Sequence, residues 1–375
     1  MTQEIVILRN GGKMNEELYW FWFANIPGIG TRKGKILLQY FHTPEQIFYA
    51  KEKELCEIDG ITVRDAKYIC KAERKDLKGK YMNLKKRGIE FVPLVSNEYP
   101  NRLKQIDDPP LAIYAMGHLP PEDKQSIAIV GARNCSYYGK EMAEYFAGVL
   151  AESGFSIISG MAKGIDGFAH WGAMRKNKET YAVLGTGVDI CYPKCHTLLY
   201  QHIIQTGGII SEFLPGTTAA PWHFPMRNRI ISALSDGILL VEARRKSGSL
   251  ITVDAGLEQG KDIFAVPGRI GDEKSEGCNE MIRMGGNLVN SPQQIVEYYS
   301  LLFSSSNKNH EKVNIFLETT EKIVYANLRC EPKHMDEIAT QSGLTGTEVL
   351  KALISLENKS LCEEVMQNYY IRKVI

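Results

Sequence analysis

Long apolar runs are missing from this sequence of 375 residues. No stretch approaches the roughly 18 consecutive apolar residues that a membrane-spanning helix needs, and the start, MTQEIVILRNGGK, lacks the basic and apolar segments of a secretion signal. We therefore expect a cytoplasmic protein that does not enter a membrane. With 44% hydrophobic and 24% charged residues, the chain can bury the cores of two or three domains.

Closely paired cysteines are missing as well. The eight cysteines are scattered without a CxxC pair, which argues against a zinc ribbon and against a disulfide framework. Cys191 and Cys195, with His196 beside them, form the closest cluster, but no second cluster at ligand spacing completes a metal site. We expect reduced thiols, no bound metal ion and no cofactor.

A surplus of charge of either sign is also absent. The 45 basic and 44 acidic residues leave a net charge of +1 at pH 7, and residues 311–375 hold eight basic and ten acidic residues. No segment is a basic tail, so the charge of the whole molecule does not indicate nucleic-acid binding. Any such site must be a local feature of the fold.

Short helices separated by turns are predicted for residues 15–78. The segment IPGIG at 26–30, followed by a helical stretch with Lys33 and Lys35, has the form of a helix-hairpin-helix, in which glycines let main-chain amides approach a phosphate. A plain turn between two helices explains the same residues. Both interpretations stay open at this point.

Residues 126–290 repeat a short apolar run, a glycine-bearing turn and a stretch with helical periodicity. This order predicts a parallel sheet whose strands are covered by helices on both faces. An additional strand, IEFVPLV, is expected between residues 80 and 125. The predicted parallel strands are 127–130, 155–159, 181–185, 208–211, 237–243 and 263–267.

The end of the chain has a different organisation. A polar stretch, LLFSSSNKNHEKVN, has the composition of a linker, and the segments after it have the order of a winged helix-turn-helix. Because this segment is net acidic, contact with a protein or plain packing is favoured over DNA readout. We predict a helical module at 1–78, an extended Rossmann domain that binds DNA at 79–303 and a winged-helix-like domain at 312–375.

The turns that follow the predicted strands are the expected binding site. Open parallel sheets bind ligands beyond the carboxyl ends of their strands, and right-handed crossovers bring those ends to one edge. The turns at 131–139, 159–170, 185–194 and 242–252 combine glycine or serine with cations, which suits a row of phosphates. Candidate residues in these turns are Arg133, Ser159, Gly160, Lys163, Lys194, Ser247, Gly248 and Ser249, and Arg227, Arg229 and the run 244–246 add cations near the same edge.

A catalytic constellation does not emerge. The sequence contains no Walker A lysine motif, no HExxH and no GxSxG. Asp166, His170, Asp189 and Glu242 could be combined into an acid and base pair, but their spacing does not require it, and we favour structural roles for the first three. We therefore predict a binding protein that is not an enzyme.

Several motifs together resemble the DNA-processing protein A (DprA/Smf) family over roughly residues 80–300. FPMRNRIISALS at 224–235 followed by EARRKSGSLIT at 242–252 is the most specific part. The resemblance implies an extended Rossmann domain flanked by an N-terminal SAM-like or helix-hairpin-helix module and a C-terminal winged helix. It also implies that the protein binds and protects incoming single-stranded DNA during natural transformation, helps load the RecA recombinase and forms a homodimer through the Rossmann domain. DNA-contacting residues implied by the motifs are Arg133, Lys194, Phe224, Arg227, Asn228 and Arg229.

Departures from the family pattern are mild. The first turn reads GAR where many relatives have GSR, the second reads SGMA rather than SGLA, and His196 stands where asparagine is usual, which puts that side-chain contact in doubt. The alternative is a nucleoside monophosphate phosphoribohydrolase of the LOG (lysine-decarboxylase-like) type. Its PGGxGT-E phosphate motif is missing here, so this function is the second choice.

Overall fold

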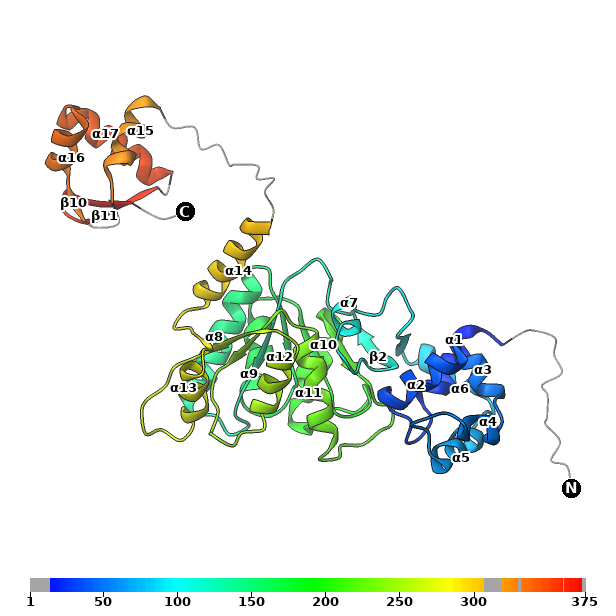
Figure 1. Cartoon of the computed structure of the whole chain (residues 1–375). Helices are drawn as coiled ribbons and strands as arrows, with labels where there is room; N and C mark the ends of the chain where they lie inside the picture. The colour runs from blue at the N-terminus through cyan, green and yellow to red at the C-terminus, as the bar shows by residue number, and fades with distance from the viewer. Residues whose placement is uncertain (1–13, 307–317, 330–331, 360, 373–375) are drawn as a thin grey trace, which may run out of the picture. The chain divides into compact units, whose positions relative to one another are not determined.

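The computed structural model describes residues 14–306, 318–329, 332–359 and 361–372. The chain divides into two compact units, residues 1–302 and 303–375, which are described separately (Figure 1). The predicted linker at 301–314 falls largely on residues 307–317, outside the described residues. No helix in the described part of the chain is long and apolar enough to cross a membrane.

The first unit begins with six helices and two glycine-bearing turns. Helix α1 buries Tyr19 to Phe23 without a break, because other helices and the first strand surround it. Gly28, between α1 and α2, and Gly60, between α4 and α5, have φ angles of +79° and +85°, which glycine adopts without steric cost. The helices are α1 (Glu16–Ala24), α2 (Thr31–Phe41), α3 (Pro44–Tyr49), α4 (Glu52–Cys56), α5 (Val63–Lys71) and α6 (Leu77–Lys86).

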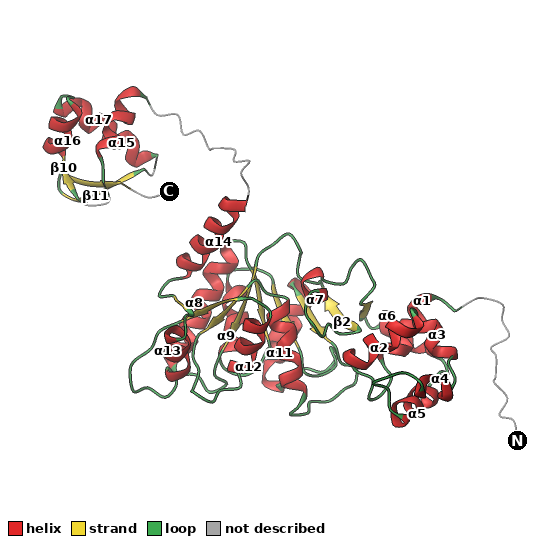
Figure 2. Ribbon diagram, in the orientation of Figure 1, coloured by secondary structure: helices red, strands yellow, loops and turns green. Residues whose placement is uncertain are grey.

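A sheet of nine strands forms the centre of this unit (Figure 2). Its order is β1-β2-β6-β5-β4-β3-β7-β8-β9; β3 to β9 are parallel, whereas β2 runs antiparallel to both β6 and β1. The predicted parallel sheet is therefore confirmed, with an antiparallel extension at one edge. The strands are β1 (Glu90–Pro93), β2 (Ala112–Gly117), β3 (Ser126–Val130), β4 (Ser156–Ser159), β5 (Thr180–Val183), β6 (Gly208–Ser211), β7 (Gly237–Leu240), β8 (Asp262–Ala265) and β9 (Asn287–Leu288).

Helices cover both faces of the sheet and create two apolar layers. On one face Phe146 of α8 packs in a cluster with Ile127 and Ile129 of β3, and on the other Ile230 of α11 packs in a cluster with Ala128 and Val130 of the same strand. Successive residues of β3 thus enter opposite layers, which explains its uninterrupted apolar sequence. The helices of this part are α7 (Asn101–Lys104), α8 (Tyr137–Glu152), α9 (Ile165–Arg175), the short 3₁₀ helix η1 (Lys194–His196), α10 (Thr197–Thr206), α11 (His223–Ala233), α12 (Leu250–Glu258), α13 (Glu276–Arg283) and α14 (Pro292–Ser306).

The second unit combines three helices with a small antiparallel sheet. Helices α15 (Thr319–Asn327), α16 (Met335–Ser342) and α17 (Gly346–Asn358) pack with strands β10 (Lys333–His334), β11 (Cys362–Met366) and β12 (Tyr369–Arg372) in the order β10-β12-β11. Val324, Ile338 and Leu353 are fully buried in the shared core. Gly343, in the left-handed region at φ +69°, ends α16 and separates it from α17.

Candidate nucleic-acid interface

The turns after four neighbouring strands enclose a cleft at the carboxyl edge of the large sheet. It has a volume of about 720 Å³, and its walls come from the turns after β3, β4, β5 and β7 and from α11 and α12. The chain adds β4, β5 and β6 on one side of β3 and then returns to place β7 on the other side. Ligands of open parallel sheets bind where the strand order reverses in this way.

A smaller hollow of about 90 Å³ adjoins this cleft and shares Arg133, Tyr192 and Phe224 with it. The rings of Tyr192 and Phe224 lie 5.6 Å apart at 33°, and the guanidinium of Arg133 lies 5.3 Å from the centre of the Phe224 ring. An aromatic face beside a cation offers a base and its phosphate complementary partners. This is the arrangement that a single nucleotide strand needs.

Exposed cations surround the two cavities. Arg133 and Lys163 line the hollow, and Arg244 and Lys246 line the cleft. Among the described residues Arg133 makes no hydrogen bond and no ion pair, whereas Arg244 lies 3.2 Å from Glu273 in an exposed pair that holds it weakly. Arg133, which lines both cavities, is therefore well placed to contact an anionic ligand.

Arg227 is buried, and its guanidinium donates hydrogen bonds to the main chain of two turns instead of facing solvent. Its side chain is 4% exposed; it donates to the carbonyl oxygens of Gly160, at 2.6 Å, and of Val183. The main-chain N–H groups of Gly160 and Ala162 favour the charged form of the buried Asp166 carboxylate, so the N–H of Gly160, like its carbonyl, faces a polar group inside the protein. Burial lowers the pKa of Arg227 to about 10 and raises that of Asp166, and each charge counteracts the shift of the other.

These contacts change the expected role of the second turn. The sequence predicts that the amides of this turn are available to phosphates, but those of Gly160 and Ala162 face the buried Asp166 carboxylate and favour its charged form. Ser159 is fully buried, and its hydroxyl donates to the carbonyl oxygen of Ile129 at 2.6 Å, so it lies away from any ligand. Lys163, by contrast, is exposed at the hollow. In the turn after β4, Lys163 is thus the side chain that can contact a ligand, and the main chain that carries it is held by contacts inside the protein.

The remaining candidates divide into those at the cleft and those beside it. Asn228 lines the cleft and accepts a hydrogen bond from Arg227 Nε at 3.1 Å, and Ser247, Gly248 and Ser249 line its other wall. Lys194 is exposed at the start of η1, but it is not among the residues that line the two cavities. The structure thus brings most of the predicted residues together around the two cavities, whereas Lys194 lies outside these cavities.

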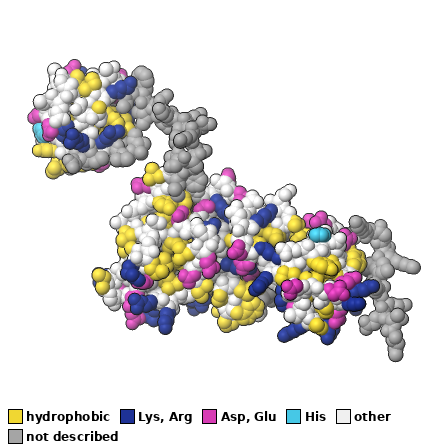
Figure 3. All heavy atoms as spheres, in the orientation of Figure 1, with side chains coloured by type: hydrophobic (Ala, Val, Ile, Leu, Met, Phe, Trp, Pro, Cys, Tyr) yellow, Lys and Arg dark blue, Asp and Glu magenta, His cyan; other side chains and the backbone are white. Residues whose placement is uncertain are grey.

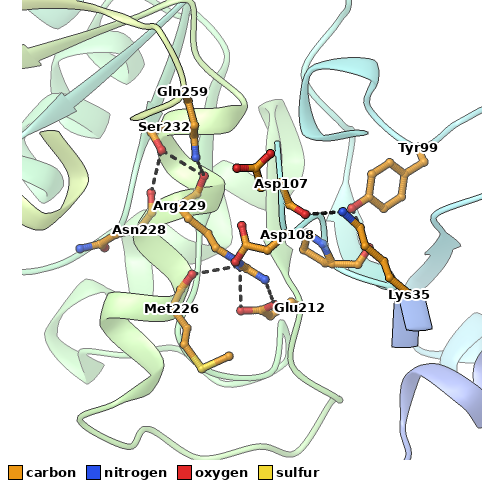
Figure 4. A network of polar contacts seen from close by, with 11 residues as sticks. Lys35, Tyr99, Asp107, Asp108, Glu212, Met226, Asn228, Arg229, Ser232 and Gln259 are labelled. Atoms are coloured by element: carbon orange, nitrogen blue, oxygen red, sulfur yellow. Dashed lines mark hydrogen bonds and ion pairs between the residues drawn. The ribbon is translucent and has the colours of Figure 1, made fainter. Parts of the chain in front are cut away.

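Arg229 points away from the cleft and holds a separate network (Figure 4). Its guanidinium lies 2.7 Å from Asp108 and 2.7 Å from Glu212, and it also donates to the carbonyl oxygen of Met226. Burial raises the pKa of Glu212, and the charge of Arg229 opposes that shift. Since residues two apart on a helix do not share a face, Arg227 reaches the turns and Arg229 does not.

The residues that could have formed an acid and base pair make structural contacts instead. Asp189 pairs with Arg87 from the C-terminus of α6 and accepts the N–H of Gly216, which ties the third turn to the helical module. His170 is fully buried against the Thr180 hydroxyl, and burial lowers its pKa to about 3, so it is neutral. Glu242 accepts from the N–H and hydroxyl of Ser136, the N-cap of α8.

Sequence reasoning missed several residues of the cleft. Tyr192 stands inside a turn that was singled out for its lysine, and its aromatic ring was not considered. Pro221 and Lys274 line the cleft from segments that were not read as turns of the binding edge. The aromatic residue next to a predicted phosphate-binding turn was a usable signal for Tyr192, whereas Lys274 required the positions of β8 and α13.

The Arg229 network predicts an effect on stability rather than on binding. Arg229→Ala leaves the largely buried Glu212 without a counter-charge, which should cost about 2 to 3 kcal/mol in unfolding free energy. In this variant burial keeps the folded-state pKa of Glu212 above its unfolded value, so the deficit should shrink as the pH falls. Urea unfolding at several pH values measures both effects.

Asp108→Ala is the matched control, because it removes the more exposed partner and should cost less than about 1 kcal/mol. We expect both variants to bind nucleic acid like the parent at temperatures where they are folded. If Arg229→Ala were as stable as the parent but bound nucleic acid much more weakly, Arg229 would be part of the interface and our interpretation of its network would be wrong.

Comparison with known proteins identifies the family. The family model described as DNA recombination-mediator protein A matches residues 90–300, more than half of the chain. The chain belongs to this family. The resemblance seen in the motifs is therefore confirmed, and the cleft lies within the matched region of this recombination-mediator chain.

Relatives in the DNA recombination-mediator protein A family match well beyond one motif. Protein Smf of Escherichia coli is 36% identical over 306 residues, which cover 80% of this chain and 81% of that protein. The X-ray structure of DNA processing protein A from Streptococcus pneumoniae has a TM-score of 0.67 at 31% identity, covering 76% of this chain and 98% of that one. The Helicobacter pylori protein, whose structure concerns its single-stranded DNA binding mode, has a TM-score of 0.52 at 29% identity, covering 58% and 96%.

Proposed function

We propose that the cleft and the adjoining hollow bind single-stranded DNA. The observation that carries this proposal is Arg133, an exposed cation that makes no hydrogen bond or ion pair with the described residues and lies over the Phe224 ring at the junction of the two cavities. A strand with its bases unpaired can place a base against an aromatic ring while its phosphates meet cations. The single-stranded DNA binding of the Helicobacter pylori relative supports the same assignment.

The proposed contacts come from three groups of residues. Arg133, Lys163 and Lys246 contact phosphates, Phe224 and Tyr192 contact bases, and the 247–249 segment contacts the backbone through polar groups. Arg227, Asn228 and Gly160 position the turns. Lys194 contributes from outside the cavities, where a longer strand passes it.

The wider role that we propose follows the family. The protein protects incoming single-stranded DNA in the cytoplasm during natural transformation, helps to load the RecA recombinase on it and works as a homodimer through the α/β domain. It acts by binding, with no catalytic residues, no metal ion and no cofactor. Hydrolysis of nucleoside monophosphates, the alternative function, has no feature of the cleft in its favour.

The domain organisation that we propose keeps three parts. Residues 1–78 form a SAM-like or helix-hairpin-helix module, 79–303 an extended Rossmann domain, and 312–375 a winged-helix-like domain. The turns at Gly28 and Gly60, each leading to a longer helix, support the first assignment, although Lys33 pairs with Asp65 at 2.6 Å and Lys35 donates to Asp107. Three helices with a small antiparallel sheet support the last.

A direct titration tests the proposal. We expect the full chain to bind a single-stranded oligonucleotide more tightly than the duplex of the same length, because the bases of a duplex are not free to reach Phe224 and Tyr192. If Arg133, Lys163 and Lys246 each release one counterion, log Kd should change with log salt with a slope of about 2, since each contact adds about 0.7. Binding should therefore weaken roughly 20-fold between 50 and 200 mM salt.

Fluorescence anisotropy at four salt concentrations gives both results. Equal affinity for single strands and duplexes, or affinity that does not change with salt, would refute the cationic cleft as the binding site.

A further inference from the structure

Trp222 is a large apolar side chain left in solvent beside the cleft. It occupies the N-cap position of α11 and is 60% exposed, whereas Trp20 and Trp22 are buried and Trp171 is half-buried. The indole is backed by aromatic rings: His223 lies 4.0 Å away at 71° and Phe213 lies 6.3 Å away at 80°. Phe213 and His223 in turn lie 4.1 Å apart. We call Phe213, Trp222, His223 and Met226 the Trp222 platform.

The platform borders the cleft through its chain neighbours Pro221 and Pro225. Pro221 and Pro225 line the cleft, and Trp222 and Met226 each follow one residue later. Trp222 and Met226, four residues apart, share one strip of α11, which borders the cleft at Pro221 and Pro225 and lies across the helix from Phe224 and Ile231. Met226 is 41% exposed. Figure 3 shows hydrophobic side chains gathered at the foot of α11.

The segment that carries the platform has no carboxylate of its own. Residues 213–226 contain no Asp, Glu, Lys or Arg. The nearest carboxylate in the sequence, Glu212, is neutralised by Arg229 at 2.7 Å. Phosphates of a bound strand therefore meet no unpaired carboxylate in residues 212–226. The attraction at this position would come from the Trp222 indole acting on a base.

We propose that Trp222 stacks on a nucleobase of the strand as it leaves the cleft, forming a base site separate from Phe224. The proposal rests on the proposed function of the cleft. A nucleobase is the occupant that fits, because the platform adjoins a cation-lined cleft, presents an aromatic ring and is flanked by uncharged residues. Every base has a π face, so the site accepts any of them.

Tryptophan fluorescence and affinity together test the stacking. Trp222 is the most exposed of the four tryptophans, and stacking on a base quenches an indole. We expect an oligothymidylate to quench the full chain and the Trp171→Phe control alike, and to leave Trp222→Phe with little quenching although it still binds. An oligonucleotide whose bases are replaced by abasic sites keeps its phosphates and should not quench the parent.

Affinity should fall about five- to tenfold for Trp222→Ala and less for Trp222→Phe, which keeps a ring. The dependence on salt should stay that of the parent, because no phosphate contact is removed. Tyr40→Ala, which removes an exposed ring from α2, should bind like the parent. Thermal melting checks that each variant is folded.

The outcomes separate the two proposals. If the parent does not bind single strands in the anisotropy titration, the function of the cleft is wrong. If the parent binds, but Trp222→Ala binds equally well and DNA does not quench the tryptophan fluorescence of the parent, the Trp222 site is refuted. The proposed function of the cleft is then unaffected. A Trp222→Ala protein that loses a dimer and binds DNA normally would show that the platform meets a second copy of this chain instead.

Discussion

Replacing Arg133 with alanine should weaken single-stranded DNA binding about ten- to a hundredfold and leave the melting temperature unchanged. The guanidinium is exposed and makes no hydrogen bond or ion pair with the described residues, so its loss opens no cavity and breaks no buried ion pair. A well-aligned contact between a charged donor and a phosphate is worth about 1.5 to 3 kcal/mol, which corresponds to that loss of affinity. Arg133→Glu should bind still more weakly, since repulsion is added to the lost attraction.

Two lysine variants make this prediction specific. Lys178 is exposed just before β5, at the opposite edge of the sheet, so Lys178→Ala changes the net charge equally and should bind like the parent. Lys194→Ala should lose only a fewfold, because Lys194 does not line the cavities. Anisotropy titrations at physiological salt compare all three variants. If Arg133→Ala and Lys178→Ala bound equally well, Arg133 would have no place in the interface.

Replacing Arg227 should damage stability and binding together. Arg227→Met leaves the carbonyl oxygens of Gly160 and Val183 without their donor and deprives the buried Asp166 of a compensating charge. We expect a loss of about 3 to 5 kcal/mol and a melting temperature lower by on the order of 10 °C. DNA binding should also be lost, because the turns that carry Lys163 and Tyr192 are no longer held in position.

A second substitution tests the electrostatic part of this argument. Asp166→Asn in the Arg227→Met background removes the uncompensated charge, so the double variant should regain at least about 1 kcal/mol relative to Arg227→Met alone. Calorimetry on the four proteins of the cycle gives the coupling energy. If the stability that the double variant loses relative to the parent equalled the sum of the two single losses, Asp166 and Arg227 would act independently.

The strands and the binding edge could be predicted from sequence because each depends on local pattern. The apolar runs at 127–130 and 263–267 are unbroken, as strands covered on both faces must be, and the rule for open sheets then locates the site at their carboxyl ends. Strand β2 escaped prediction, since its position beside β6 depends on a long-range antiparallel contact.

The individual site residues were harder, because direction and pairing depend on packing. Arg227 and Arg229 belong to one motif, yet one holds the turns and the other holds Asp108 and Glu212. Helical geometry alone would have separated them. The interior position of the Ser159 hydroxyl and the use of the Gly160 amide by Asp166 required the packed structure.

The double hold on Gly160 has an evolutionary consequence. Its carbonyl accepts a hydrogen bond from Arg227 and its amide faces the Asp166 carboxylate, so groups inside the protein fix the shape of this turn. The groups left to meet a ligand, Arg133, Lys163 and the Phe224 ring, are side chains on an architecture that is already complete. Substitutions can change these side chains one at a time without preventing folding. The ligand preference of the cleft can therefore change during evolution while the stability of the fold is kept.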